Sequence, residues 1–104
     1  MISRRWHGVV PAHKADAYAA YLLQTGISDY KATPGNLGVF MSRRVEGDVV
    51  HFETISLWES LAAIRSFAGD DIEAAKYYPE DSGFLLELEP KVVHHEVLMS
   101  YFAV

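Results

Sequence analysis

The sequence predicts an α+β fold in which two helices cover one face of a four-stranded antiparallel sheet. Runs rich in β-branched and aromatic residues alternate with runs whose apolar residues recur at helical spacing. The order of these runs is strand, helix, strand, strand, helix, strand, which is the split-βαβ pattern. The change from strand to helix is clearest at residues 58–69, and the rest of the chain is organised around this stretch.

Length and composition limit the classes of protein that the chain can represent. Its 104 residues are typical of one domain, which we place over residues 1–104. The formal net charge of −5 argues against nucleic acid or an anionic membrane surface as a partner. The sequence has no cysteine, no apolar run long enough to cross a membrane and no signal-peptide pattern, so we expect a cytoplasmic protein.

The first half of the chain predicts two strands separated by helix. Tyr18, Tyr21 and Leu22 lie at spacings of three and four, which is typical of one helix face, and Gly26 is the expected helix stop. Pro34-Gly35-Asn36 is a strong turn signal before the second strand. We expect, in order, a strand, a helix, a short helical or irregular extension and a strand over residues 2–10, 13–26, 27–33 and 37–45.

The second half begins with a hairpin and a capped helix. Gly47 at the first central position of the turn predicts a type II′ hairpin leading into a strand over residues 49–58. Ser60 is the expected N-cap of the next helix, and Gly69 is its expected end. Beyond this helix we expect a short helix, a loop and two strands over residues 72–78, 79–83, 84–89 and 92–102, with an apolar tail over residues 98–104 that covers another surface.

This order of elements predicts the ferredoxin-like arrangement, with strand order 4-1-3-2 and both helices on one face. The other face of the sheet would then be bare in a monomer. The strands carry apolar residues for both faces, so we expect a homodimer that packs sheet against sheet.

The chain also resembles the antibiotic-biosynthesis-monooxygenase group of the dimeric α+β barrel superfamily. The resemblance rests on the element order over nearly the whole chain and on four short motifs. They are Trp58-Glu59-Ser60, Pro34-Gly35-Asn36, Phe67-Ala68-Gly69 and His94-His95-Glu96-Val97.

The resemblance implies a dimeric α+β barrel and an oxidation by O₂ that needs no metal or flavin. The substrate, an aromatic or polyketide-like molecule, supplies the electrons after it has been deprotonated. Such a site needs an apolar cavity, a proton acceptor and groups that hold an anion. We expect the cavity between sheet and helices, with His94 as proton acceptor and Trp58 as the second catalytic candidate. The candidate substrate-binding residues are Tyr18, Thr54, Phe67, Tyr78 and Arg44.

The sequence departs from two well-described branches of this group. The quinone-forming branch has an Asn where this chain has Thr54 and a Tyr where it has Ile64. The heme-degrading branch has an Asn in the first strand and an iron-binding His on the second helix. Neither is present here, so we expect no heme, no other cofactor and no metal.

Two other functions fit the same pattern. One is a non-catalytic homodimer that binds a small ligand in the same pocket. The other is a metal-dependent enzyme, because His7, His51 and one of His94 or His95 lie on strands that would be neighbours. A lone histidine that accepts a proton is the simpler use of these residues, since the unperturbed pKa of histidine is about 6.5.

Overall fold

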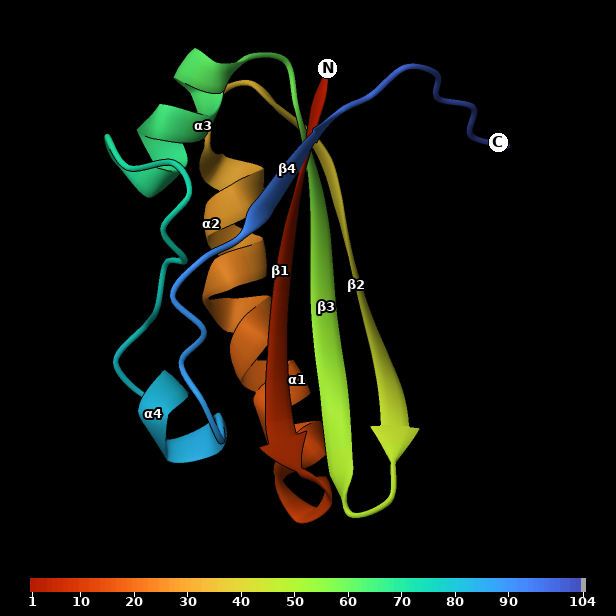
Figure 1. Ribbon diagram of the computed structural model, residues 1–104, viewed down its shortest axis with the longest axis vertical. Helices are drawn as coiled ribbons and strands as arrows, with labels where there is room; N and C mark the ends of the chain where they lie inside the picture. The colour runs from red at the N-terminus through yellow and green to blue at the C-terminus, as the bar shows by residue number, and fades with distance from the viewer. Residues whose placement is uncertain (104) are drawn as a thin grey trace.

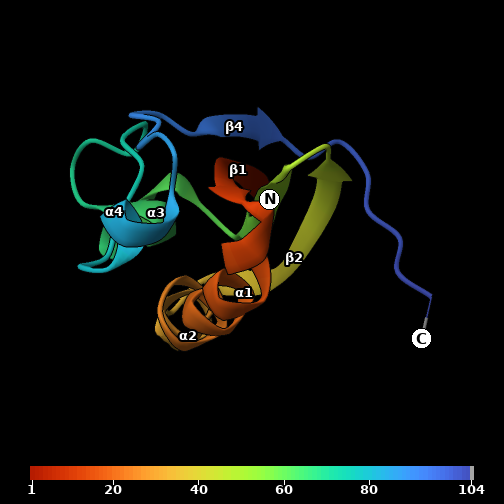
Figure 2. The same ribbon diagram turned by 90° about the horizontal axis from the view of Figure 1, so that it is seen from below.

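The computed structural model describes residues 1–103 and shows a four-stranded antiparallel sheet with helices packed against one face (Figure 1, Figure 2). The strands are β1 (Ile2–Pro11), β2 (Asn36–Glu46), β3 (Val49–Trp58) and β4 (Val93–Glu96). Their order across the sheet is β2-β3-β1-β4, which confirms the predicted order 4-1-3-2. The predicted α+β, ferredoxin-like class is therefore correct.

The first helical region is divided in two. A 3-10 turn, η1 (Ala12–Lys14), leads into α1 (Ala15–Gln24) and then α2 (Gly26–Ala32). The backbone leaves helical geometry only at Thr25, whose hydroxyl donates a hydrogen bond to the Tyr21 carbonyl at 2.8 Å. Gly26 therefore begins the second helix instead of ending the first, and the predicted extension is helical.

The strand-to-helix corner after β3 forms as the sequence predicts. Ser60 caps α3 (Leu61–Ala68) by accepting a hydrogen bond from the Ala63 N–H at 3.1 Å. Gly69 follows with a φ of +89°, a backbone region that only glycine enters cheaply. The turn Glu46–Val49 joins β2 to β3. Gly47 is its only residue with a positive φ, as a type II′ turn requires.

The segment between α3 and β4 differs most from the prediction. The predicted helix over residues 72–78 and the predicted strand over residues 84–89 are both wrong, and a short helix, α4 (Asp81–Phe84), begins inside the predicted loop. The carbonyls of Ile72 and Ala74 accept hydrogen bonds from the Arg4 side chain, and the Ala75 N–H donates to the Pro90 carbonyl. These long-range contacts give a turn and an isolated bridge to Lys91 in place of a helix. The predicted last strand is shortened to β4.

The sheet has one covered face and one open face. Alternate residues of β1 and β3 are buried beneath the helices, including Trp6, Val10, Phe52 and Trp58. The open face carries Arg5, His7, His51 and Glu53 together with apolar residues, and most of the tail after β4 is exposed. No helix within residues 1–103 is long and apolar enough to cross a membrane.

Candidate functional site

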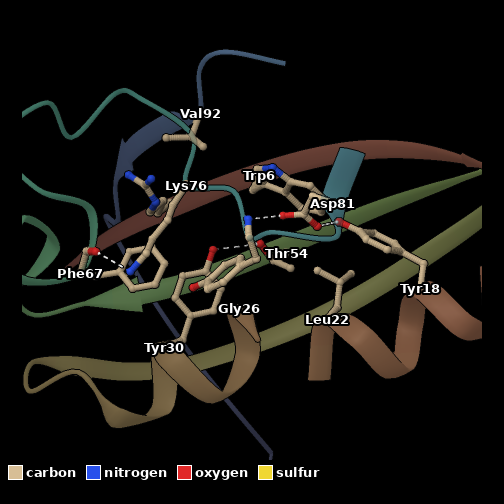
Figure 3. A pocket seen from close by; sticks show the side chains of 12 residues that line it. Trp6, Tyr18, Leu22, Gly26, Tyr30, Thr54, Phe67, Lys76, Asp81 and Val92 are labelled. Atoms are coloured by element: carbon tan, nitrogen blue, oxygen red, sulfur yellow. Dashed lines mark hydrogen bonds between the residues drawn. The ribbon is translucent and has the colours of Figure 1, made fainter. Parts of the chain in front are cut away.

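The covered face of the sheet contains an aromatic pocket between β1, β3, the helices and the segment before α4 (Figure 3). Strand alternation puts Arg4, Trp6 and Thr54 on this face, and Trp6 pairs directly with Thr54 in the β1–β3 register. The pocket holds only about 20 Å³ of free space, which is room for about one water molecule. The lining residues are Arg4, Trp6, Tyr18, Leu22, Gly26, Tyr30, Thr54, Phe67, Lys76, Tyr78, Asp81 and Val92.

Arg4 is the most unusual of these residues, because its side chain is 1% exposed and has no acidic partner within residues 1–103. Its two terminal nitrogens donate to the backbone carbonyls of Ile72 at 2.5 Å and Ala74 at 3.0 Å. Its Nε atom is buried without a hydrogen-bond partner. Burial lowers the pKa of Arg4 against the opposing effect of the nearby Tyr30 hydroxyl, but a guanidinium stays charged in proteins.

His94 lies beside Arg4 on the neighbouring strand, and its side chain faces the helices. The two residues are paired across β1 and β4, and His94 Nε2 is 3.1 Å from Arg4 Nη1. Arginine only donates hydrogen bonds, so Nε2 accepts and the ring proton of the neutral imidazole lies on Nδ1. Burial and the charge of Arg4 lower the pKa of His94, although Glu73 opposes them. His94 is therefore neutral at pH 7, with one basic nitrogen directed at Arg4.

Lys76, which is exposed, and Tyr78, which is partly exposed, line the pocket, and we call these two residues its cover. Both are held by one carboxylate on α2. Asp29 Oδ2 accepts from Lys76 Nζ at 2.7 Å and from the Tyr78 hydroxyl at 2.6 Å. Lys76 also donates to the Phe67 carbonyl at 3.2 Å and lies over the Phe67 ring, 4.6 Å from its centroid. Burial raises the pKa of Asp29, but these hydrogen bonds outweigh it and leave the pKa below the ordinary carboxyl value.

A second carboxylate, which is buried, lines the other end of the pocket. Asp81 is 3% exposed and accepts from the Tyr18 hydroxyl at 3.0 Å and from the backbone N–H of Tyr78 at 2.6 Å. Burial, then Asp81, raises the pKa of Tyr18, and burial, then Asp29, raises the pKa of Tyr78. Both phenols are therefore protonated donors at neutral pH.

The structure brings together four of the five predicted substrate-binding residues and separates the fifth. Tyr18, Thr54, Phe67 and Tyr78 line the pocket. Arg44 does not, because the β2–β3 register places it beside His51 on the open face, where it pairs with Glu46 at 2.9 Å.

The two catalytic candidates lie near the pocket without lining it. His94 reaches it only through Arg4. Trp58 is fully buried in the core, where its ring packs near Tyr30 and Phe67 and its Nε1–H donates to the Ser56 hydroxyl at 2.8 Å.

Sequence reasoning did not identify Arg4, Trp6, Tyr30, Lys76 or Asp81 as site residues. The sequence contains a signal for two of them, because Arg4 and Trp6 are alternate residues of β1 and therefore lie on the same face of the sheet. The position of Lys76 and Asp81 depends on the irregular segment, whose path no local pattern predicts.

The histidines do not form the cluster that a metal-dependent enzyme would need. His7 Nε2 lies 2.9 Å from His51 Nδ1 on the open face, whereas His94 faces the helices. Within residues 1–103, no group of three or more His, Cys, Asp or Glu side chains is arranged to hold a metal ion.

Comparison with solved structures identifies the fold. A mutant of MhuD with two manganese protoporphyrin IX molecules per active site matches with a TM-score of 0.66 at 18% identity, over 99% of this chain and 100% of that one. MhuD of Mycobacterium tuberculosis, a heme-degrader with two hemes in its active site, matches with a TM-score of 0.65 at 18% identity, over 98% and 100%. HapK of Hahella chejuensis matches with a TM-score of 0.64 at 16% identity, over 100% and 99%.

These matches confirm the resemblance at the level of the fold. MhuD and HapK belong to the antibiotic-biosynthesis-monooxygenase group, whose members have the dimeric α+β barrel fold, and this chain shares the fold of their subunits over its length. No protein-family profile matches the sequence, and no curated protein matches it.

The residues of this pocket do not fit a heme. α3 carries no histidine, and the basic nitrogen of His94 accepts a hydrogen bond from Arg4. An imidazole that binds iron needs that nitrogen free, so His94 is not placed to hold a heme iron.

Proposed function

We propose that this protein is a cofactor-independent monooxygenase that oxidises an aromatic or polyketide-like molecule in the pocket between sheet and helices. The observation that carries the proposal is a neutral imidazole, His94, in contact with a buried guanidinium, Arg4, that lines an aromatic pocket. A proton acceptor beside a fixed positive charge is what the formation of a phenolate or enolate requires.

In this proposal, the substrate hydroxyl takes the place of Arg4 Nη1 at His94 Nε2 and transfers its proton to that nitrogen. The resulting anion is electron-rich and reacts with O₂ at a CH₂ carbon that is conjugated with the ionised oxygen. That carbon loses two hydrogens and gains one oxygen atom as a carbonyl, and the second oxygen atom leaves with the two hydrogens as water. The Tyr30 and Thr54 hydroxyls, 3.3 Å apart in the pocket, orient the substrate.

Oxygen uptake with a hydroxylated anthrone tests the proposal, because conversion to the quinone consumes one O₂ and releases one water. We expect His94→Gln to lower turnover by about 10²-fold or more, the usual scale for loss of a general base. His95→Gln is the matched control, since His95 is the next residue but faces the open side of the sheet. Equal rates for the two variants would remove His94 from the mechanism.

The pH profile gives a second test. The pKa of His94 is lowered, so the fraction of neutral, basic imidazole is already high at neutral pH and falls only as the pH drops below the ordinary histidine value. We expect kcat/KM to be flat through neutral pH and to decline in acid, and His94→Gln should remove the acid limb. A rise in rate toward acid pH would contradict a basic His94.

The second candidate function is binding of a small ligand without catalysis. It is favoured by the contact between His94 and Arg4, because a nitrogen that already accepts a hydrogen bond is a weaker base. Binding of the anthrone without oxygen uptake would establish this function instead.

We also propose that the protein acts as a homodimer joined through the open faces of two sheets. Exposed apolar side chains, including Phe40 of β2 and Phe102 of the tail, line a groove on this side of the molecule. Leu98, Met99 and Tyr101 are also exposed. A second copy would cover this apolar surface, and the structurally similar proteins have the dimeric α+β barrel fold.

A further inference from the structure

The open face of the sheet carries four titratable side chains that three hydrogen-bond contacts join into a row. Glu89 Oε2 lies 2.7 Å from His7 Nδ1, and His7 Nε2 lies 2.9 Å from His51 Nδ1. At the other end of the row, His51 Nε2 lies 3.2 Å from Glu46 Oε1. We call His7 and His51 the histidine pair. The row joins β1, β3, the end of β2 and the segment before β4, and the proposed oxidation does not use it.

The three contacts fix the number of protons on the histidine pair. An ionised carboxylate only accepts hydrogen bonds, so His7 Nδ1 and His51 Nε2 must each carry a proton. The contact between the rings needs one further proton, on either His7 Nε2 or His51 Nδ1. Four ring nitrogens therefore share three protons, so that one ring is neutral and the other is an imidazolium. With two protons one contact would lack its donor, and with four protons two N–H groups would face each other.

The charges around the histidine pair give the same number independently. Arg5 donates to Glu53 at 2.5 Å, and Arg44 donates to Glu46 at 2.9 Å. Glu89 is the third carboxylate of this cluster, and within residues 1–103 its only cationic partner is a ring of the pair. Two guanidiniums and one imidazolium match three carboxylates, so the cluster is electrically neutral when the pair holds three protons.

The remaining titratable groups beside this cluster do not change that balance. Arg43 is matched by Asp16, to which it donates at 2.8 Å. The Tyr77 hydroxyl donates to the Glu89 carbonyl, and burial raises the pKa of Tyr77, so this phenol is uncharged at neutral pH. The pair also borders a polar hollow of about 280 Å³, through which it can exchange protons with water.

We infer that the histidine pair is a proton-binding site, which holds one shared proton at pH 7 and thereby balances the charge of the open face. A further proton, gained in acid, separates the rings and leaves an excess positive charge. Loss of the shared proton in alkali leaves an excess negative charge and breaks the contact to Glu46, which is the longest of the three and the most exposed. An effect on association rests on the proposed dimer, whereas the shared proton does not.

Nitrogen NMR of the wild-type protein at pH 7, with ¹⁵N-labelled histidine, tests the shared proton. Scalar coupling between His7 Nε2 and His51 Nδ1 requires a proton between these two nitrogens, and we expect to observe it. The outer nitrogens, His7 Nδ1 and His51 Nε2, should both have the chemical shifts of protonated nitrogens. An unprotonated signal from either outer nitrogen would mean two neutral rings and would overturn the inference.

A carboxylate variant tests the charge balance. Glu46→Gln removes one negative charge from the cluster, so we expect two protons on the four ring nitrogens in place of three. Asp48→Asn is the matched control, since Asp48 is an exposed carboxylate of the same turn that lies outside the row, and this variant should keep three protons. Three protons in Glu46→Gln, or two in Asp48→Asn, would overturn the charge balance.

Sedimentation equilibrium at pH 5, 7 and 9 tests the effect on the proposed dimer. Two copies that face each other carry the same excess charge in acid or in alkali, so we expect the dissociation constant to be lowest at pH 7. It should be higher by up to about 5-fold on either side, the scale of an exposed ion pair.

Two double variants assign this minimum to the pair. His7→Gln with His51→Gln should remove the minimum, whereas His13→Gln with His95→Gln, which removes two exposed histidines outside the row, should keep it. A minimum that survives the first double variant would overturn the role of the pair in association. A monomer at every pH would remove the proposed dimer, and the nitrogen signals would still decide whether the proton is shared.

Discussion

Replacement of Asp29 by Asn should open the pocket to ligands. The free space of about 20 Å³ admits about one water molecule, so the pocket must widen before an aromatic ligand can bind, and we expect the cover of Lys76 and Tyr78 to move away. Both cover residues donate to one oxygen of Asp29, at 2.7 and 2.6 Å. The observed rate of ligand association therefore depends on the fraction of molecules in which these bonds are broken.

The size of the effect follows from the contacts that the substitution weakens. A hydrogen bond to a charged group contributes about 1.5–3 kcal/mol when it is protected from water. The Asp29 and Lys76 side chains are 34% and 36% exposed, so solvent screening reduces their contribution. Loss of the charge should therefore favour the open state by about 1–2 kcal/mol, which corresponds to a factor of about 5–30 in the open fraction.

Stopped-flow tryptophan fluorescence measures this change, because Trp6 lines the pocket and its emission should respond when para-nitrophenol arrives. We expect association with Asp29→Asn to be about 5–30-fold faster than with the wild type, following the open fraction. Asp16→Asn is the matched control, since it removes the same charge from an exposed ion pair with Arg43, away from the pocket. An unchanged association rate in Asp29→Asn, or an equal gain in Asp16→Asn, would refute the idea that Lys76 and Tyr78 limit entry to the pocket.

Acid provides an independent check on the same contact. The pKa of Asp29 is lowered in the folded protein, so its stabilising contribution is present above the ordinary carboxyl pKa and is lost as the pH falls through the lowered value. Association with the wild type should therefore accelerate in this acid range. Asp29→Asn has no titrating group at this position, so a similar acceleration in the variant would assign the effect to another carboxylate.

Three further predictions follow from the fold and the pocket. Light scattering should show twice the 11.7 kDa mass of the chain, and a monomer at micromolar concentration would contradict the proposed dimer. The purified protein should contain no stoichiometric metal and should not retain added heme through gel filtration; a persistent Soret band would contradict the heme prediction. Gly35→Ala should destabilise the fold by about 2–4 kcal/mol in a denaturant titration, because Gly35 has a φ of +90° and an added Cβ would lie 2.4 Å from the Ala63 Cβ; Gly38→Ala, whose Cβ meets no atom within 4 Å, should cost much less.

The first three strands were predictable because their signals are local. The period-two pattern of residues 49–58 assigns the faces of β3, and the signals at Ser60, Gly69 and Gly47 mark the ends of neighbouring elements. Each of these features depends on residues within a few positions of one another, so the sequence alone specifies them.

The segment before β4 was not predictable, because its conformation depends on distant partners. Its carbonyls at Ile72 and Ala74 bond to Arg4, which lies 68 and 70 residues earlier in the chain. The predicted helix over residues 72–78 would use these carbonyls for its own hydrogen bonds, and Arg4 removes them from that use. The same long-range contact places Lys76 and Tyr78 over the pocket, so an error in this segment also became an error in the site.

The position of His94 illustrates the limit of sequence reasoning for the site itself. Alternation along the strand does not decide which face of the sheet His94 lies on. The register pairs His94 with Arg4, and this places it on the face toward the helices. For Arg44, the register selects the open face instead, and the arginine of the pocket is Arg4. Residue type pointed to an arginine and a histidine, but only strand register shows which of them meet.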